Sequence, residues 1–123
     1  MHRKIALIIG VVSMLLVAAY AQEIPAGYEW SSPMGALRKS DNPQIYVFDT
    51  TAGNYLTDHK ETIVQYKTKP DKGLSPLGVT LKGKLLKIDG VADVAVEYRR
   101  LWIQKFPLDS WEVIMPELQK VLK

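Results

Sequence analysis

Two segments of this chain have helical hydrophobic periodicity, and each follows a pair of short segments in which apolar and polar residues alternate as in strands. The strand-type segments are residues 44–49, 62–67, 91–98 and 101–106. Arg99-Arg100 is a poor two-residue turn because neither residue readily adopts a positive φ, so we expect a slightly longer loop there. The order β-β-α-β-β-α predicts an α+β fold, a two-layer sandwich with an antiparallel sheet and two helices on one face.

The first predicted helix has a clear start. Ser75 is a favourable N-cap, and Pro76 occupies the first helical position, where its missing N–H costs nothing. Gly78 and Gly83 should each weaken this helix by about 1 kcal/mol relative to alanine, so its stability must come from packing. The apolar stripe that would pack consists of Leu77, Leu81, Leu85 and Ile88.

The second predicted helix begins after Asp109 or Ser110 and carries a complete apolar face. Pro116 lies beyond the first turn, where proline is tolerated, so a kink or a restart is expected there. The apolar face consists of Trp111, Ile114, Met115, Leu118, Val121 and Leu122.

The first 21 residues have the pattern of a signal peptide. A positive start is followed by an apolar run and then by Ala19-Tyr20-Ala21, which predicts cleavage before Gln22. An uncleaved membrane anchor is the alternative, because the apolar run reaches the lower limit for spanning a bilayer. Either way the sequence predicts an exported domain, periplasmic or extracellular. Without residues 1–21 the formal net charge falls from +3 to +1, with 14 Lys+Arg against 13 Asp+Glu, so nucleic-acid binding is not indicated.

The chain contains no cysteine. Disulfides, thiolate zinc sites and a cysteine nucleophile are therefore excluded, and so is an iron–sulfur cluster held by cysteines of this chain alone. Residues 22–42 are rich in Pro, Gly and Ser and predict a linker or extended arm, with a docking peptide as the alternative. Residues 43–123 form the predicted domain.

Several motifs follow one another in residues 42–123: Asn42-Pro43, Ser75-Pro76-Leu77, Leu85-Leu86-Lys87-Ile88-Asp89-Gly90-Val91-Ala92-Asp93-Val94, Trp102-Ile103-Gln104-Lys105 and Trp111-Glu112-Val113-Ile114-Met115-Pro116. In this order they resemble the N-terminal domain of Nfu/NifU-type iron–sulfur scaffold proteins. The resemblance implies a ββαββα fold and a role in contacting partner proteins. In that family the cluster is carried by a separate domain with a Cys-x-x-Cys pair, which this chain lacks.

We expect a non-enzymatic module that binds a protein partner, with no catalytic residues and no cofactor. If the helices cover only one face of the sheet, a set of aromatic side chains on the other face is exposed, as interfaces favour. The candidate interaction face is Tyr46, Phe48, Trp102 and Phe106. An iron–sulfur or iron-related accessory function, by analogy with the family, is an alternative.

His59 and the lysines of residues 60–87 can each be explained as ordinary solvent-exposed residues or as part of a functional site. His59 lies in Asp58-His59-Lys60-Glu61 and could be the centre of a small metal- or ligand-binding site. Neighbouring residues of a strand point to opposite faces, so these side chains would not converge on one ion. No metal site is therefore predicted. Residues 60–87 carry seven lysines against two acidic residues, and such a patch could attract an acidic partner or a membrane surface. The candidate basic patch is Lys67, Lys69, Lys72, Lys84 and Lys87.

Overall fold

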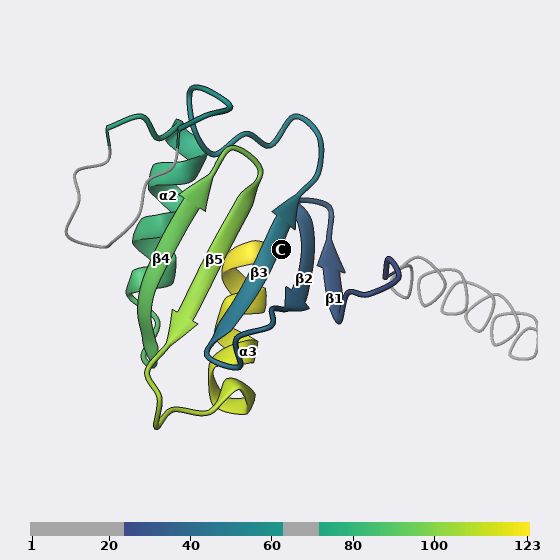
Figure 1. Cartoon of the computed structure of the whole chain (residues 1–123), viewed down its shortest axis with the longest axis vertical. Coiled ribbons are helices and arrows are strands. Elements are labelled where there is room, and N and C mark those ends of the chain that lie inside the picture. Colours follow the sequence, from purple (N-terminus) through teal and green to yellow (C-terminus); the bar gives the residue numbers. More distant parts are fainter. Residues whose placement is uncertain (1–23, 63–71) are drawn as a thin grey trace, which may run out of the picture.

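The computed structural model describes residues 24–62 and 72–123. The elements are β1 (Trp30–Ser32), β2 (Gly35–Lys39), β3 (Ile45–Thr50), α2 (Pro76–Leu86), β4 (Val91–Glu97), β5 (Arg100–Lys105) and α3 (Trp111–Leu122). The strands form one antiparallel sheet in the order β1-β2-β3-β5-β4. Figure 1 shows α2 and α3 on the same side of this sheet. The predicted α+β class is confirmed, whereas the order ββαββα is not.

The largest difference from the sequence prediction lies in residues 22–42. A linker or extended arm was expected, but β1 and β2 form a hairpin there and extend the sheet beyond β3. Leu37 in β2 is completely buried in the core, and Trp30 and Met34 pack against it. The alternating run in β2 is only five residues long and stands among Pro, Gly and Ser, so it has too few residues to show a period.

Two predicted segments fall largely or wholly outside the described residues. The predicted signal peptide, 1–21, lies outside them, as does the predicted strand 62–67 apart from Thr62. Within the described ranges, no helix combines the length and the apolar character needed to cross a membrane.

Helix α2 begins as predicted. The backbone N–H of Gly78 donates a hydrogen bond of 3.0 Å to the Oγ of Ser75, and Pro76 is the first helical residue. Leu81 and Leu85 are buried against the sheet, which confirms the predicted apolar stripe. Ser75 also donates a hydrogen bond of 2.6 Å to the carbonyl of Tyr55, so the cap ties the helix to the preceding loop.

Replacing Ser75 with alanine should destabilise the fold by about 1 kcal/mol, because the N–H of Gly78 loses its acceptor. The midpoint of urea denaturation measures this loss. The variant Ser75→Thr is the control: it keeps a hydroxyl that can accept from the N–H of Gly78 and donate to the carbonyl of Tyr55, and should recover most of the stability. Equal midpoints for Ser75→Ala and the natural sequence would show that the cap does not contribute.

Helix α3 also begins as predicted, with the Oγ of Ser110 accepting from the N–H of Glu112. The helix continues through Pro116, so the expected restart does not occur. Buried side chains on both sides of the proline, Ile114 and Leu118, hold the helix against the sheet. Packing therefore compensates for the hydrogen bond that proline cannot make.

The turn between β4 and β5 is tighter than expected. Glu97 pairs with Arg100, so the loop consists of only Tyr98 and Arg99. The ring of Tyr98 stacks on that of Tyr55 with centroids 4.4 Å apart. The Arg99 guanidinium donates to the carbonyl of Thr50. These contacts to distant residues stabilise a turn that its own residues do not favour.

Candidate functional site

The sheet has one face that no described helix covers. On the helix-covered face, Leu37, Phe48 and Leu101 lie side by side and are completely buried. Because side chains alternate along each strand, their neighbours point to the opposite side. Cross-strand pairing aligns these neighbours in two adjacent rows. We call the resulting surface the open face; it consists of Ala36, Arg38, Val47, Asp49, Ala95, Glu97, Arg100 and Trp102.

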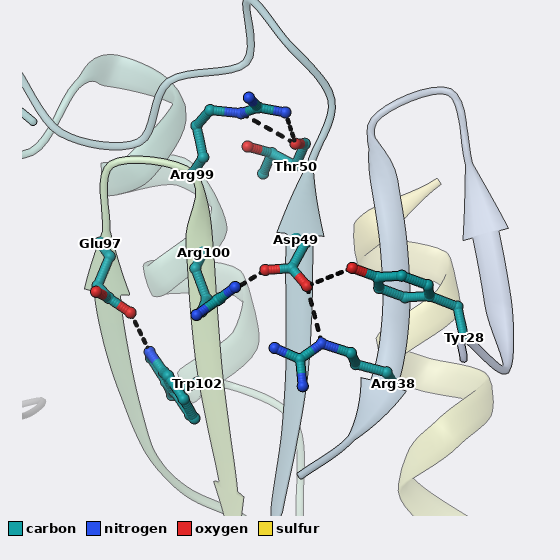
Figure 2. A network of polar contacts seen from close by, with 8 residues as sticks. All are labelled: Tyr28, Arg38, Asp49, Thr50, Glu97, Arg99, Arg100 and Trp102. Carbon is teal, nitrogen blue, oxygen red and sulfur yellow. Dashed lines mark hydrogen bonds and ion pairs between the residues drawn. The ribbon is translucent and has the colours of Figure 1, made fainter. Parts of the chain in front are cut away.

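A polar network centred on Asp49 lies on the open face near the C-terminal end of β3 (Figure 2). Arg100 donates from Nε to one carboxylate oxygen at 2.6 Å. Arg38 donates from Nε to the other oxygen at 2.9 Å, and the hydroxyl of Tyr28 donates to the same oxygen at 2.7 Å. These residues come from β2, β3, β5 and the segment before β1, so the network joins four parts of the chain.

The electrostatics of this network favour the charged form of Asp49. Its burial alone would raise the pKa of the carboxyl, but hydrogen bonds from Arg100, Tyr28 and Arg38 outweigh it and lower the pKa below the ordinary value of 3.8. The hydrogen bond to Asp49 in turn raises the pKa of Tyr28 and of Arg38. At neutral pH the centre therefore contains one carboxylate between two guanidinium groups.

Trp102 lies next to this network. Its indole Nε1 donates to the carboxylate of Glu97, and the Arg100 guanidinium carbon lies 5.6 Å from the ring centroid, within cation–π range. Val47 and Ala95 flank it on the neighbouring strands. The ring is partly exposed, so together with the Arg100 guanidinium it presents an aromatic and cationic surface on the open face.

A cleft of about 390 Å³ opens at one end of the open face, beside the Tyr98-Arg99 turn. Arg99 closes one side, where its Nε and Nη2 donate to the carbonyl of Thr50 at 3.2 and 2.7 Å. The cleft is lined by Asp49, Thr50, Lys60, Glu97, Tyr98, Arg99 and Arg100.

The predicted interaction face is wrong for two of its four residues. Tyr46 and Phe48 are 5% and 0% exposed, because they pair with Ile103 and Leu101 on the helix-covered side. The hydroxyl of Tyr46 donates to Glu29, and burial together with this bond raises the pKa of Tyr46. Trp102 lies on the open face, as predicted.

Phe106 is the fourth predicted residue of that face. It directly follows β5 and its side chain is 46% exposed. Its exposure therefore agrees with the prediction, but it belongs to the loop after the strand.

The candidate basic patch is only partly described. Lys72, Lys84 and Lys87 are exposed, whereas Lys67 and Lys69 lie outside the described residues. Lys82, which belongs to the same lysine-rich run, is only 3% exposed. The sequence run is therefore not a single solvated surface.

His59 lies in an exposed loop. In residues 24–62 and 72–123, no group of three or more His, Cys, Asp or Glu side chains is arranged to hold a metal ion. His59 therefore belongs to no such group within the described ranges.

The sequence did not single out Tyr28, Arg38, Asp49, Arg99 and Arg100. Asp49 was read as the end of a strand and Arg99-Arg100 as a turn, while Tyr28 was assigned to a linker. Arg38 directly follows the buried Leu37 in β2, but a strand of five residues is too short for this to serve as a sequence signal. Their convergence depends on strand register, which the sequence pattern does not reveal.

Two solved structures have a fold similar to that of this chain. No protein-family model matches the chain, and no curated protein matches it. The crystal structure of protein SAV1430 from Staphylococcus aureus is similar, with a TM-score of 0.55 and 16% sequence identity over 71% of this chain and 94% of that chain. The solution NMR structure of the same protein gives a TM-score of 0.53 and 15% identity over 75% of this chain and 91% of that chain. At such identity the likeness shows a shared fold and no shared activity.

Proposed function

We propose that this chain is an exported, non-enzymatic module that binds a partner protein through its open face. The observation that carries the proposal is the arrangement of Arg38 and Arg100 around Asp49, with Trp102 beside them on a sheet face that no described helix covers. Arginine and tryptophan contribute strongly to binding energy at protein interfaces. Because Asp49 holds both guanidinium groups in place, little side-chain entropy would be lost on binding.

The resemblance to the N-terminal domain of Nfu/NifU-type proteins is part of this proposal. An α+β fold in which Ser75 and Ser110 cap the two helices supports it. On this view the chain keeps the partner-contacting role of that domain. The alternatives, an iron-related accessory function and a ligand site around His59, lack a specific supporting observation in the described residues.

A pull-down from the exported fraction tests the proposal, with the natural chain and the variant Trp102→Ala as baits. A partner identified by mass spectrometry should be lost with Trp102→Ala, because the variant removes the aromatic surface and the cation–π contact of Arg100. Val113→Ala is the control, because this exposed apolar residue lies on α3, on the helix side of the sheet.

Both variants must retain the circular dichroism spectrum of the natural chain. A partner retained equally by Trp102→Ala and Val113→Ala would contradict binding through the open face. A partner lost only with Val113→Ala would move the interface to the helix layer.

A further inference from the structure

The cleft beside the Tyr98-Arg99 turn has an excess of positive charge. Its lining includes three basic residues, Lys60, Arg99 and Arg100, and two acidic ones, Asp49 and Glu97. The formal charge of the cleft is therefore +1. The acidic residues are already engaged: Asp49 accepts from Arg38, Arg100 and Tyr28, and Glu97 accepts from Trp102. The cleft therefore presents cations whose charge is not fully compensated by its own carboxylates.

The arginines of the cleft keep most of their donors for a ligand. Arg100 contacts Asp49 through Nε, and Arg99 contacts the carbonyl of Thr50 through Nε and Nη2. The other N–H groups of both guanidinium groups make no hydrogen bond to the residues that the structure describes. Lys60 is exposed and lines the same cleft, and it forms no ion pair with the residues that the structure describes.

The turn that carries Arg99 is held in place on two sides. The stacked rings of Tyr55 and Tyr98 fix one side, and the two hydrogen bonds to Thr50 fix the other. A guanidinium held in this way loses little freedom when it binds a planar anion.

We infer that this cleft binds a carboxylate of the partner protein, so that the open face recognises an acidic segment. The inference rests on the proposed function, since Asp49, Glu97 and Arg100 belong to both the open face and the cleft. A carboxylate matches the planar geometry of the guanidinium donors. A single negative charge also balances the formal charge of the cleft, whereas a doubly charged phosphate would leave the cleft with a net negative charge.

Titration with a blocked hexaglutamate peptide tests this inference. Binding is followed by NMR through the Nε–H signals of Arg99 and Arg100. We expect saturable shifts of these signals that weaken as salt is added, and no shifts with a blocked hexaglutamine peptide. Absence of binding by hexaglutamate, or equal binding of both peptides, would overturn the inference.

Variants locate the site within the chain. Arg99→Gln should weaken hexaglutamate binding about tenfold, because a charge-assisted hydrogen bond is lost. That variant also loses contacts to Thr50, so Lys60→Gln serves as a second variant that removes no described contact. We expect a loss of up to about fivefold for Lys60→Gln, as for an exposed ion pair.

Lys84→Gln is the matched control, because it removes the same charge from an exposed position on α2 and should bind like the natural chain. Equal affinities for Lys60→Gln, Arg99→Gln and Lys84→Gln would overturn the inference. Displacement of the peptide by inorganic phosphate at much lower concentration than by acetate would overturn the choice of a carboxylate.

The two proposals can fail separately. If hexaglutamate does not bind but partner capture still depends on Trp102, only the carboxylate site is wrong. If hexaglutamate binds through Arg99 and Lys60 while partner capture is independent of Trp102, the carboxylate site stands and the open face is not the partner interface.

Discussion

Replacing Gly78 with alanine should destabilise the protein by about 3 kcal/mol, while the same substitution at Gly83 should stabilise it by about 1 kcal/mol. Both glycines lie in α2. A Cβ atom at Gly78 would overlap the backbone carbonyl of Leu56, whereas a Cβ atom at Gly83 meets no atom within 4 Å. A backbone atom cannot turn aside as a flexible side chain can, so α2 would have to move away from the loop.

The physical basis is the close approach of α2 to the segment around Leu56. Leu56 is completely buried, its N–H donates to the carbonyl of Tyr98, and its carbonyl accepts from the N–H of Ser75. These two hydrogen bonds hold the carbonyl where the new methyl group would lie. At the exposed Gly83, alanine only improves the intrinsic helix propensity.

Urea denaturation of the two variants and the natural chain measures both effects. The comparison is matched, because both variants replace a glycine of α2 with alanine and only the surroundings of the two positions differ. A loss below about 1 kcal/mol for Gly78→Ala would show that α2 does not pack closely on Leu56. Destabilisation by Gly83→Ala would contradict an open position at that residue.

Replacing Asp49 with asparagine should destabilise the protein by about 2 kcal/mol at neutral pH. The variant keeps the shape of the side chain but removes the charge that faces Arg38 and Arg100. The two guanidinium groups would then repel each other across a neutral amide. Because both arginines are partly exposed, solvent screening keeps the expected loss below that of a fully buried ion pair.

The same carboxylate gives the stability a dependence on pH. The pKa of Asp49 is lower in the folded protein than in the unfolded chain, where it is near 3.8. Its contribution is therefore complete above the unfolded value and is lost as the pH falls through the folded pKa. Asp49→Asn should remove this part of the acid sensitivity.

Denaturation midpoints at pH 7 and at pH values below about 4 test the prediction. Glu117→Gln is the control, because its carboxylate forms an exposed pair with Lys120 and should change stability by less than about 0.5 kcal/mol. An Asp49→Asn variant with the stability and the acid sensitivity of the natural chain would contradict a stabilising role for the network.

The helix starts were predictable because their signals are local. A capping serine followed by proline at Ser75-Pro76, and Ser110 before an apolar face, specify where the chain turns into a helix. The strands β3, β4 and β5 were also located to within about two residues, since each has enough alternating residues to show a period. The short strands β1 and β2 were missed because they are stabilised by pairing across the sheet, β1 with β2 and β2 with β3, and not by a pattern within either strand.

The candidate site was predicted only through Trp102. The alternation within each strand was assigned correctly, but Tyr46 and Phe48 were grouped with Trp102 although they share a face with Leu101 and Ile103. A shift of one residue in strand register moves every side chain to the other face, and a pattern within one strand does not contain that information.

The helix caps, the apolar stripes and the alternation within the longer strands can all be predicted from the chain's local pattern. Long-range packing sets which side of the sheet is covered, makes Gly78 differ from Gly83, and brings Asp49 between Arg38 and Arg100. The first group of features depends on neighbours within a few residues along the chain. The second depends on contacts between distant segments, whose register is set by the packing of the whole core.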